Sequence, residues 1–292
     1  MPSSTELITA ILSGLGIGGL FAVAALGLSL VFGVMRLINL AHGELIVLGA
    51  YLSYSLAQWI GLDPLLSILI VAPVVALIAY PLQRYGLTPV MKGDGTAPLL
   101  ITFGVSVVLQ NLFILIYTPD VRSLNASYAV ANFKVGGITV SVVYIITLVA
   151  GLVLLGLTHL VVTRTGFGRR LRAASEDPAA AAVMGVSVPQ MYAATFAIAA
   201  GSAAVAGVLV GLTFSFGPTA GTAYLITGFA VVVLGGIGSI KGTLVGGLLL
   251  GIIESVGAAF VGDGWRVFIG CLVVLLVLSI RPQGIFGTAG GN

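Results

Sequence analysis

The sequence is poor in charge. Only 7% of its 292 residues are Asp, Glu, Lys or Arg, whereas hydrophobic residues make up 59%. Soluble globular domains carry roughly 25% charged residues, so this composition excludes an ordinary soluble domain. The mean hydropathy of +1.19 points the same way. The composition therefore indicates an integral membrane protein.

Groups that catalyse reactions or bind metals are also scarce. The single cysteine, Cys271, lies inside the last apolar run, can form no internal disulfide and is interpreted as a small core residue. No HxxxH, CxxC or carboxylate cluster occurs, so we expect no metal site. No nucleophile with a matching base and no GxxxxGK(S/T) phosphate loop is visible. We therefore expect neither an enzyme nor a nucleotide-binding chain, and no nucleic-acid partner.

The chain does contain long uncharged runs. A helix needs about 20 apolar residues to cross a bilayer core about 30 Å thick. Suitable runs occupy residues 7–35, 45–62, 64–83, 95–119, 135–163, 178–240 (long enough for two crossings joined near 216–222), 242–262 with one acid, and about 265–280. They predict an all-α bundle of about nine transmembrane helices, with eight as the alternative. No soluble domain is apparent, so residues 1–292 form a single membrane domain in this interpretation.

Basic residues are unevenly distributed between the predicted loops. Short cytoplasmic loops are enriched in Lys and Arg. If the loop at 164–186 is cytoplasmic, alternation of nine helices leaves only Arg122, Lys134 and Arg266 outside. This distribution predicts an N-terminus outside and a C-terminus in the cytoplasm.

The most strongly charged segment is RTGFGRRLRAASEDPAAAAVMGV, residues 164–186. Asp177 followed by Pro178 is typical of a helix start, because Asp caps free backbone N–H groups and Pro has none to lose. Gly185 suits the position that follows a helix. These residues predict a helix of about two turns outside the bilayer with an alanine-rich, apolar surface. Such a helix either docks in a groove of a soluble partner or lies on the membrane interface.

Residues 36–44, RLINLAHGE, place polar side chains between two apolar runs. One interpretation is a short cytoplasmic turn. The other is a helix broken at Gly43 inside the bilayer, where Asn39 and His42 line an aqueous path with freed backbone groups. We expect His42 to be a hydrogen-bonding structural residue rather than a proton carrier.

Two further polar features lie inside predicted spans. Glu254 falls about 20 Å into its span, where an acid either serves the pathway with a partner such as His42 or fixes helix packing. Thr102, Ser106 and Gln110 recur every four residues and so share one helix face. That face contacts either a partner helix or a pore. Glycines at the same spacing, such as those at 14 and 18, predict close helix packing, with a helix hinge as the alternative.

Four blocks of the sequence together resemble a known family. They are TGFGRRLRAASEDPAAAAVMGV, GVMRLINLAHGELIVLGAY at 33–51, LLITFGVSVVLQNL at 99–112 and VVLGGIGSIKGTLVGGLLLGIIES at 232–255. In their order and spacing they are similar to the permease subunits of bacterial ABC importers of the branched-chain amino acid type, the LivH-like permeases. The resemblance covers essentially the whole chain.

This resemblance implies a multi-pass subunit of the bacterial inner membrane that forms half of a translocation pathway. The expected solute is an amino acid, in the first place a branched-chain one, with urea or short amides as the alternative within the family. A stand-alone channel or secondary transporter is the alternative from another class. The implied partners are a second homologous permease in a heterodimer, two cytoplasmic subunits that use ATP and Mg, and a periplasmic solute-binding protein. The chain itself is expected to bind no cofactor.

The resemblance also implies roles for particular residues. The coupling loop would comprise residues 164–188, and its residues that transmit ATP-driven motion would be Glu176, Asp177, Pro178, Ala182 and Gly185. The candidate residues of the translocation pathway are Asn39, His42, Gly43, Glu44, Thr102, Ser106 and Glu254.

Overall fold

Helices dominate the structure, a computed structural model that describes residues 2–92, 96–135, 137–281 and 283–286. The α-helices are α1 (Ser4–Met35), α2 (His42–Ile60), α3 (Pro64–Pro81), α4 (Thr96–Tyr117), α5 (Val142–Arg164), α6 (Gly166–Glu176), α7 (Pro178–Val183), α8 (Val188–Thr213), α9 (Gly221–Gly235), α10 (Ile240–Val261) and α11 (Arg266–Ile280). Shorter elements are a π-helix at Leu82–Leu87, 3-10 turns at Val90–Lys92, Ser127–Ala129 and Asp263–Trp265, and strands β1 (Asn132–Val135) and β2 (Ile138–Ser141).

Each predicted apolar run coincides with helix, and the run at 178–240 contains both α8 and α9. Among the described residues, seven helices are long and apolar enough to cross a membrane. The helix α9, with 15 residues, is shorter, and the more polar α2 is not among the seven. The predicted all-α polytopic bundle is thus confirmed, whereas nine crossings remain a prediction. Residue 95, where the fourth predicted run begins, lies outside the described residues.

A short β-hairpin departs from the predicted helical pattern. Strands β1 and β2 pair antiparallel, with Asn132 opposite Ser141. The predicted run at 135–163 therefore enters its helix only at Val142. The sequence ITVS of β2 is rich in β-branched residues, which favour extended backbone over helix.

The helix α6 is a second departure, because only one helix was predicted in the charged segment at residues 164–186. The helix α5 does end at Arg164. Thr165 then caps the next helix, since its Oγ1 accepts a hydrogen bond from the Gly168 N–H at 3.2 Å. The charged segment thus contains two helices, α6 and α7, instead of one.

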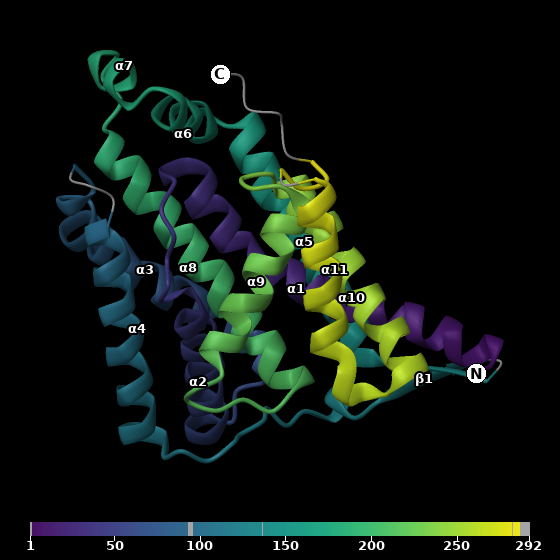
Figure 1. Cartoon of the computed structure of the whole chain (residues 1–292). Helices are drawn as coiled ribbons and strands as arrows, with labels where there is room; N and C mark the ends of the chain where they lie inside the picture. Colours follow the sequence, from purple (N-terminus) through teal and green to yellow (C-terminus); the bar gives the residue numbers. More distant parts are fainter. Residues whose placement is uncertain (1, 93–95, 136, 282, 287–292) are drawn as a thin grey trace.

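The first helix forms the centre of the bundle. Its 32 residues correspond to about 48 Å, which exceeds the bilayer core and requires a tilt. Figure 1 shows α1 running obliquely through the bundle, and it packs against α5, α8, α9 and α10. A Cβ on Gly18 would lie only 2.6 Å from the Leu248 Cα of α10. The four-residue glycine spacing therefore serves close backbone packing at this contact, as predicted.

Candidate functional site

The helix α7 is built as the sequence predicts. The Asp177 Oδ1 accepts hydrogen bonds from the N–H groups of Ala179 at 2.9 Å and Ala180 at 3.0 Å. Pro178 is the first helical residue. Gly185 follows the C-cap with φ of 81°, a conformation that glycine adopts without strain. The predicted start and end of this helix are both confirmed.

The surface of α7 is exposed and apolar. Val183 and Met184 are 86% and 83% exposed, and Ala182 is also exposed. Among the described residues its main contacts are with its neighbours α6 and α8, and Figure 1 shows it projecting from one end of the bundle. Large apolar side chains so fully exposed at the tip of a projection are typical of a binding surface.

The helix α6 anchors this projection to the bundle. Leu171 and Ala174 are 2% and 0% exposed. The Ser175 hydroxyl donates to the Gly33 carbonyl of α1 at 3.1 Å, and the Arg172 guanidinium donates to the Val162 carbonyl of α5. Glu176 is the last residue of α6 and is exposed. The helix α6 therefore connects α7 to the ends of α1 and α5.

The segment between α1 and α2 is an irregular stretch of backbone within the protein. Arg36 ends α1 in a left-handed conformation with φ of 51°. The Leu40 N–H donates to the Thr102 Oγ1 at 3.3 Å, and the Ala41 N–H donates to the Asn39 Oδ1 at 3.1 Å. Side chains thus satisfy backbone groups that no helix satisfies here, as irregular backbone at membrane depth requires.

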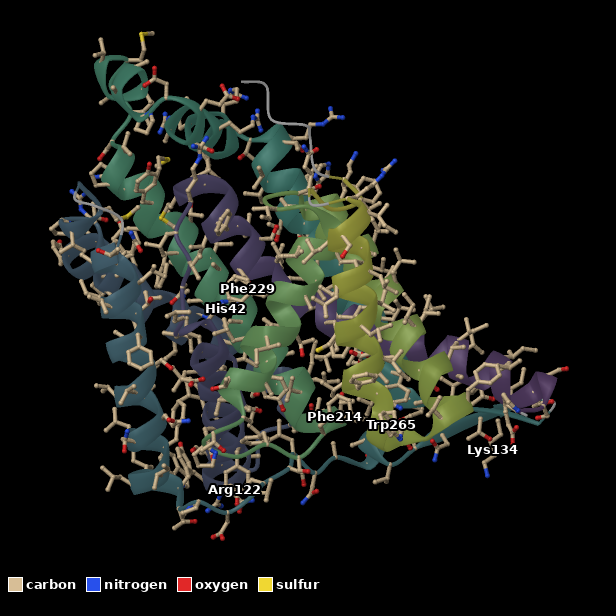
Figure 2. The ribbon with its side chains drawn as sticks, viewed as in Figure 1. His42, Arg122, Lys134, Phe214, Phe229 and Trp265 are labelled. Atoms are coloured by element: carbon tan, nitrogen blue, oxygen red, sulfur yellow. The ribbon has the colours of Figure 1, made fainter. Side chains whose placement is uncertain are left out.

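His42 begins α2 inside the bundle rather than at its surface. Its side chain is 1% exposed, and its Nε2 donates to the Ala24 carbonyl of α1 at 2.8 Å. Figure 2 places it between the end that carries α6 and α7 and the opposite end that carries Arg122. This placement agrees with a broken helix and not with a surface turn. Among the described residues no hydrogen bond joins Glu254 to His42, which was one of the candidate partners for that acid.

Glu44 is buried where α2, α4 and α9 meet. It is 2% exposed, and its Oε1 accepts a hydrogen bond from the Ser106 hydroxyl at 3.0 Å. A Cβ on Gly221, the first residue of α9, would lie 1.3 Å from the Glu44 Oε2. The carboxylate therefore rests on the backbone at the start of α9, where the helix dipole favours negative charge. Within the described chain the Oε2 has no hydrogen-bond partner.

These contacts bring most of the predicted pathway residues together. Asn39 lies just before α2, and His42, Gly43 and Glu44 form its first turn. The face of α4 with Thr102 and Ser106 contacts this segment. The part of the α4 face that carries Thr102 and Ser106 thus meets the segment at the start of α2, and its role as a pore lining stays a prediction. A Cβ on Gly43 would lie 1.9 Å from the Gly221 carbonyl oxygen, so no larger residue fits there.

Glu254 lies apart from this group. It is 7% exposed, and a Cβ on Gly270 of α11 would lie 2.3 Å from its Oε1. Its carboxylate makes no hydrogen bond within the described ranges of the chain. Close packing against α11 is therefore what the structure shows for this residue.

Sequence reasoning missed Gly221, because it is far from Glu44 along the chain and only the fold joins them. The one available signal was the FGPTAGT turn, which was interpreted as a simple connection between two crossings. The structural role of Arg122 was also missed. Its guanidinium donates to the Tyr54 hydroxyl and to the Tyr117 carbonyl, both at 2.7 Å. Arg122 thus ties the loop after α4 to α2.

Comparison with known proteins settles the family. The family described as "Branched-chain amino acid transport system / permease component" matches residues 10–278. The chain belongs to this family. It is therefore a transport permease with several membrane helices, and its family is not one of catalytic enzymes.

The permease has curated relatives of similar length. The high-affinity branched-chain amino acid transport system permease protein BraD of Pseudomonas aeruginosa is 33% identical, with 98% of each chain covered. LivH of Escherichia coli, described in the same terms, is 32% identical over 94% of each chain. The probable branched-chain amino acid transport permease protein LivH of Methanocaldococcus jannaschii is 31% identical, covering 92% of this chain and 89% of its own. No solved structure matches.

Proposed function

We propose that this chain is the permease subunit of an ABC importer for amino acids, with branched-chain amino acids as its solutes. In this proposal it forms half of the translocation pathway in the bacterial inner membrane. A second homologous permease forms the other half, two cytoplasmic subunits hydrolyse ATP with Mg, and a periplasmic protein delivers the solute. The names of the three relatives support the solute class.

The observation that carries the proposal is the form of α6 and α7. A short helix with exposed Ala182, Val183 and Met184 is capped at both ends and fixed to α1 through α6. A chain that moved solute alone would have no use for such a projection. An ATP-hydrolysing subunit that receives α7 in a groove would pull on α1 whenever it moves. Glu176, Asp177, Pro178, Ala182 and Gly185 are the proposed coupling residues.

The proposed orientation places α7 in the cytoplasm. Arg122 and Lys134 lie at the end of the bundle opposite α6 and α7 (Figure 2), whereas Arg169, Arg170 and Arg172 lie in α6. The excess of basic residues near α7 favours the cytoplasmic side for that end.

The proposed pathway follows the polar residues at the start of α2. Asn39, His42, Gly43 and Glu44, with Thr102 and Ser106 of α4, form the one place among the described spans where a helix break, a buried carboxylate and a second helix start meet. Broken helices of this kind accompany substrate sites in other transporter folds. Glu254, which packs on α11, is the remaining candidate residue of the proposed pathway.

A charge placed on α7 tests the proposal. In vesicles that contain the permease, its partner subunits and the solute-binding protein, Ala182→Glu should lower ATP-dependent leucine uptake at least tenfold. The matched control is Val130→Glu, which places the same charge at an 81% exposed residue outside the helices. Both variants should unfold at the wild-type temperature. Unchanged uptake by Ala182→Glu would refute the coupling role of α7.

Competing solutes test the solute class in the same vesicles. Leucine, isoleucine and valine should each compete with labelled leucine, whereas urea and acetamide should not. Uptake that persists without ATP and without the partner subunits would instead support a stand-alone channel or secondary transporter.

A further inference from the structure

The helix α4 is attached to the rest of the chain along only one side. It packs on α2 and on the turn at Val90–Lys92, and few of its residues are buried, chiefly Pro98, Thr102 and Phe113. Its opposite side is exposed along the whole helix. In a membrane this side faces either lipid or another protein.

The exposed side of α4 is unsuited to lipid. Asn111 is exposed six residues before the end of the helix at Tyr117, which places it about 9 Å inside the span. Its Nδ2 donates to the Val107 carbonyl at 2.8 Å, but its Oδ1 accepts no hydrogen bond within the described residues. An amide oxygen that meets only hydrocarbon is unfavourable, because nothing replaces its hydrogen bonds with water.

The other outer helices show what a lipid-facing surface of this protein looks like. The large exposed side chains of α3 and α5 are Leu, Ile and Val, and α11 adds Phe268. Cys271 of α11 is also exposed, so its interpretation as a core residue is wrong. In their middle turns α3, α5 and α11 expose no amide side chain among the described residues. The exposed face of α4, which carries an amide side chain, therefore differs from the exposed faces of these three helices.

The exposed face of α4 also has the pattern of a helix–helix contact. Leu100, Gly104, Val107 and Asn111 follow one another at spacings of four, three and four residues, the repeat with which two helices pack along a seam. A Cβ on Gly104 would meet nothing within 4 Å, so the helix has a shallow depression there. A small residue allows close approach, and an amide nearby can bond across the contact.

The polar site of this chain lies on the opposite side of the same helix. Ser106, one residue before Val107, donates to the Glu44 carboxylate, which itself rests on the start of α9. A protein that covers the outer face of α4 would therefore enclose the start of α2 near the junction of the two chains. Two homologous subunits that use the same patch would meet about a twofold axis there.

From these observations we propose that the face formed by Leu100, Gly104, Val107 and Asn111 binds the second permease subunit, which presents its own α4. This inference rests on the proposed function, since it requires a second permease. It adds the surface of contact, and it makes the amide of Asn111 the polar contact between the two subunits.

Photo-crosslinking in the complete transporter tests the proposal. A benzophenone amino acid at Val107 should yield a crosslinked product that mass spectrometry identifies as a permease of this family, either a second copy or a homologue. The matched control carries the same probe at Leu275 of α11, which is 66% exposed and should crosslink to no permease. Lipid adducts alone at position 107, capture there of another class of protein, or capture of the permease from position 275 would overturn the inference.

A second measurement examines the amide itself. Asn111→Leu should weaken the permease pair about tenfold in detergent, as judged by dissociation on dilution, and Asn111→Gln should restore most of the association. The matched control Leu112→Val should leave association unchanged. An unchanged pair with Asn111→Leu would contradict the role of the amide. If the complex transports leucine with ATP and position 107 touches only lipid, the inference fails while the proposed function stands; a transporting complex without any second permease would refute both.

Discussion

The chain starts two helices with the same dipeptide, Asp63-Pro64 at α3 and Asp177-Pro178 at α7, yet the two helices differ in their surroundings. In both, the Asp side chain accepts hydrogen bonds from two backbone N–H groups and Pro is the first helical residue. The helix α3 continues for 18 residues and packs against α8. The helix α7 ends after six residues and projects from the bundle. The same local signal thus serves packing in one place and exposure in the other.

The difference arises from what holds the capping residue. The Tyr128 hydroxyl donates to both carboxylate oxygens of Asp63, at 2.9 and 3.0 Å, and so ties the start of α3 to the loop after α4. Asp177 accepts hydrogen bonds only from its own helix within the described residues. We infer that the first cap contributes to the stability of the whole bundle, whereas the second shapes a surface.

The largest expected effect is on transport. Replacement of both Asp177 and Pro178 by Ala should lower ATP-dependent uptake at least tenfold, because α7 loses its N-cap and its fixed first residue. The unfolding temperature in detergent should change by less than about 2 °C, since a cap on an exposed helix of six residues supports little else. A large fall in unfolding temperature would show that α7 is part of the packed core and would remove the contrast with α3.

The reciprocal change should act on stability. Asp63→Ala removes the N-cap of α3 and the acceptor of the Tyr128 hydrogen bond, and loss of a cap costs about 0.5–2 kcal/mol. We expect an unfolding temperature lower by a few degrees, at roughly 2–4 °C per kcal/mol. Uptake per folded transporter should stay at the wild-type value. An uptake defect without loss of stability would mean that both Asp-Pro starts serve transport.

The smallest expected effect is a dependence on alkaline pH. Burial and the hydrogen bond to Asp63 raise the pKa of Tyr128 to about 12, above the value near 10 of an unfolded chain. A folded-state pKa raised in this way stabilises the fold fully below pH 10, and that stability is lost as the pH rises toward 12. The unfolding temperature of the wild type should therefore fall more between pH 10 and 12 than that of Tyr128→Phe. Parallel curves would show that the Tyr128–Asp63 contact does not stabilise the fold.

Much of this fold can be predicted from local patterns in the sequence. Uncharged runs locate the long helices because a bilayer core sets their length. Asp177, Pro178 and Gly185 fix both ends of α7 because capping depends on a few neighbouring residues. The strands β1 and β2 were missed, since a short apolar run beside a membrane helix has the same pattern as the helix itself.

The candidate site could be predicted only in part. Asn39, His42 and Glu44 stand out in the sequence as polar residues between apolar runs. The sequence does not show their depth in the bundle, because a broken helix and a surface turn have the same composition. The contact of Glu44 with Gly221 joins residues far apart in the chain, and no local pattern encodes it.

The length of α1 turns it into a lever. Near one end of α1, the Gly33 carbonyl accepts a hydrogen bond from the Ser175 hydroxyl of α6. Farther along α1, the Ala24 carbonyl accepts a hydrogen bond from His42 at the start of α2. A rotation of about 5° around the middle of a helix about 48 Å long displaces the end near Gly33 by about 2 Å, whereas Ala24, about 7 Å from the middle, moves by only about 0.6 Å. The first displacement is enough to break a hydrogen bond, and the second is not. One continuous helix thus joins the projection at the tip of the molecule to the buried break between α1 and α2.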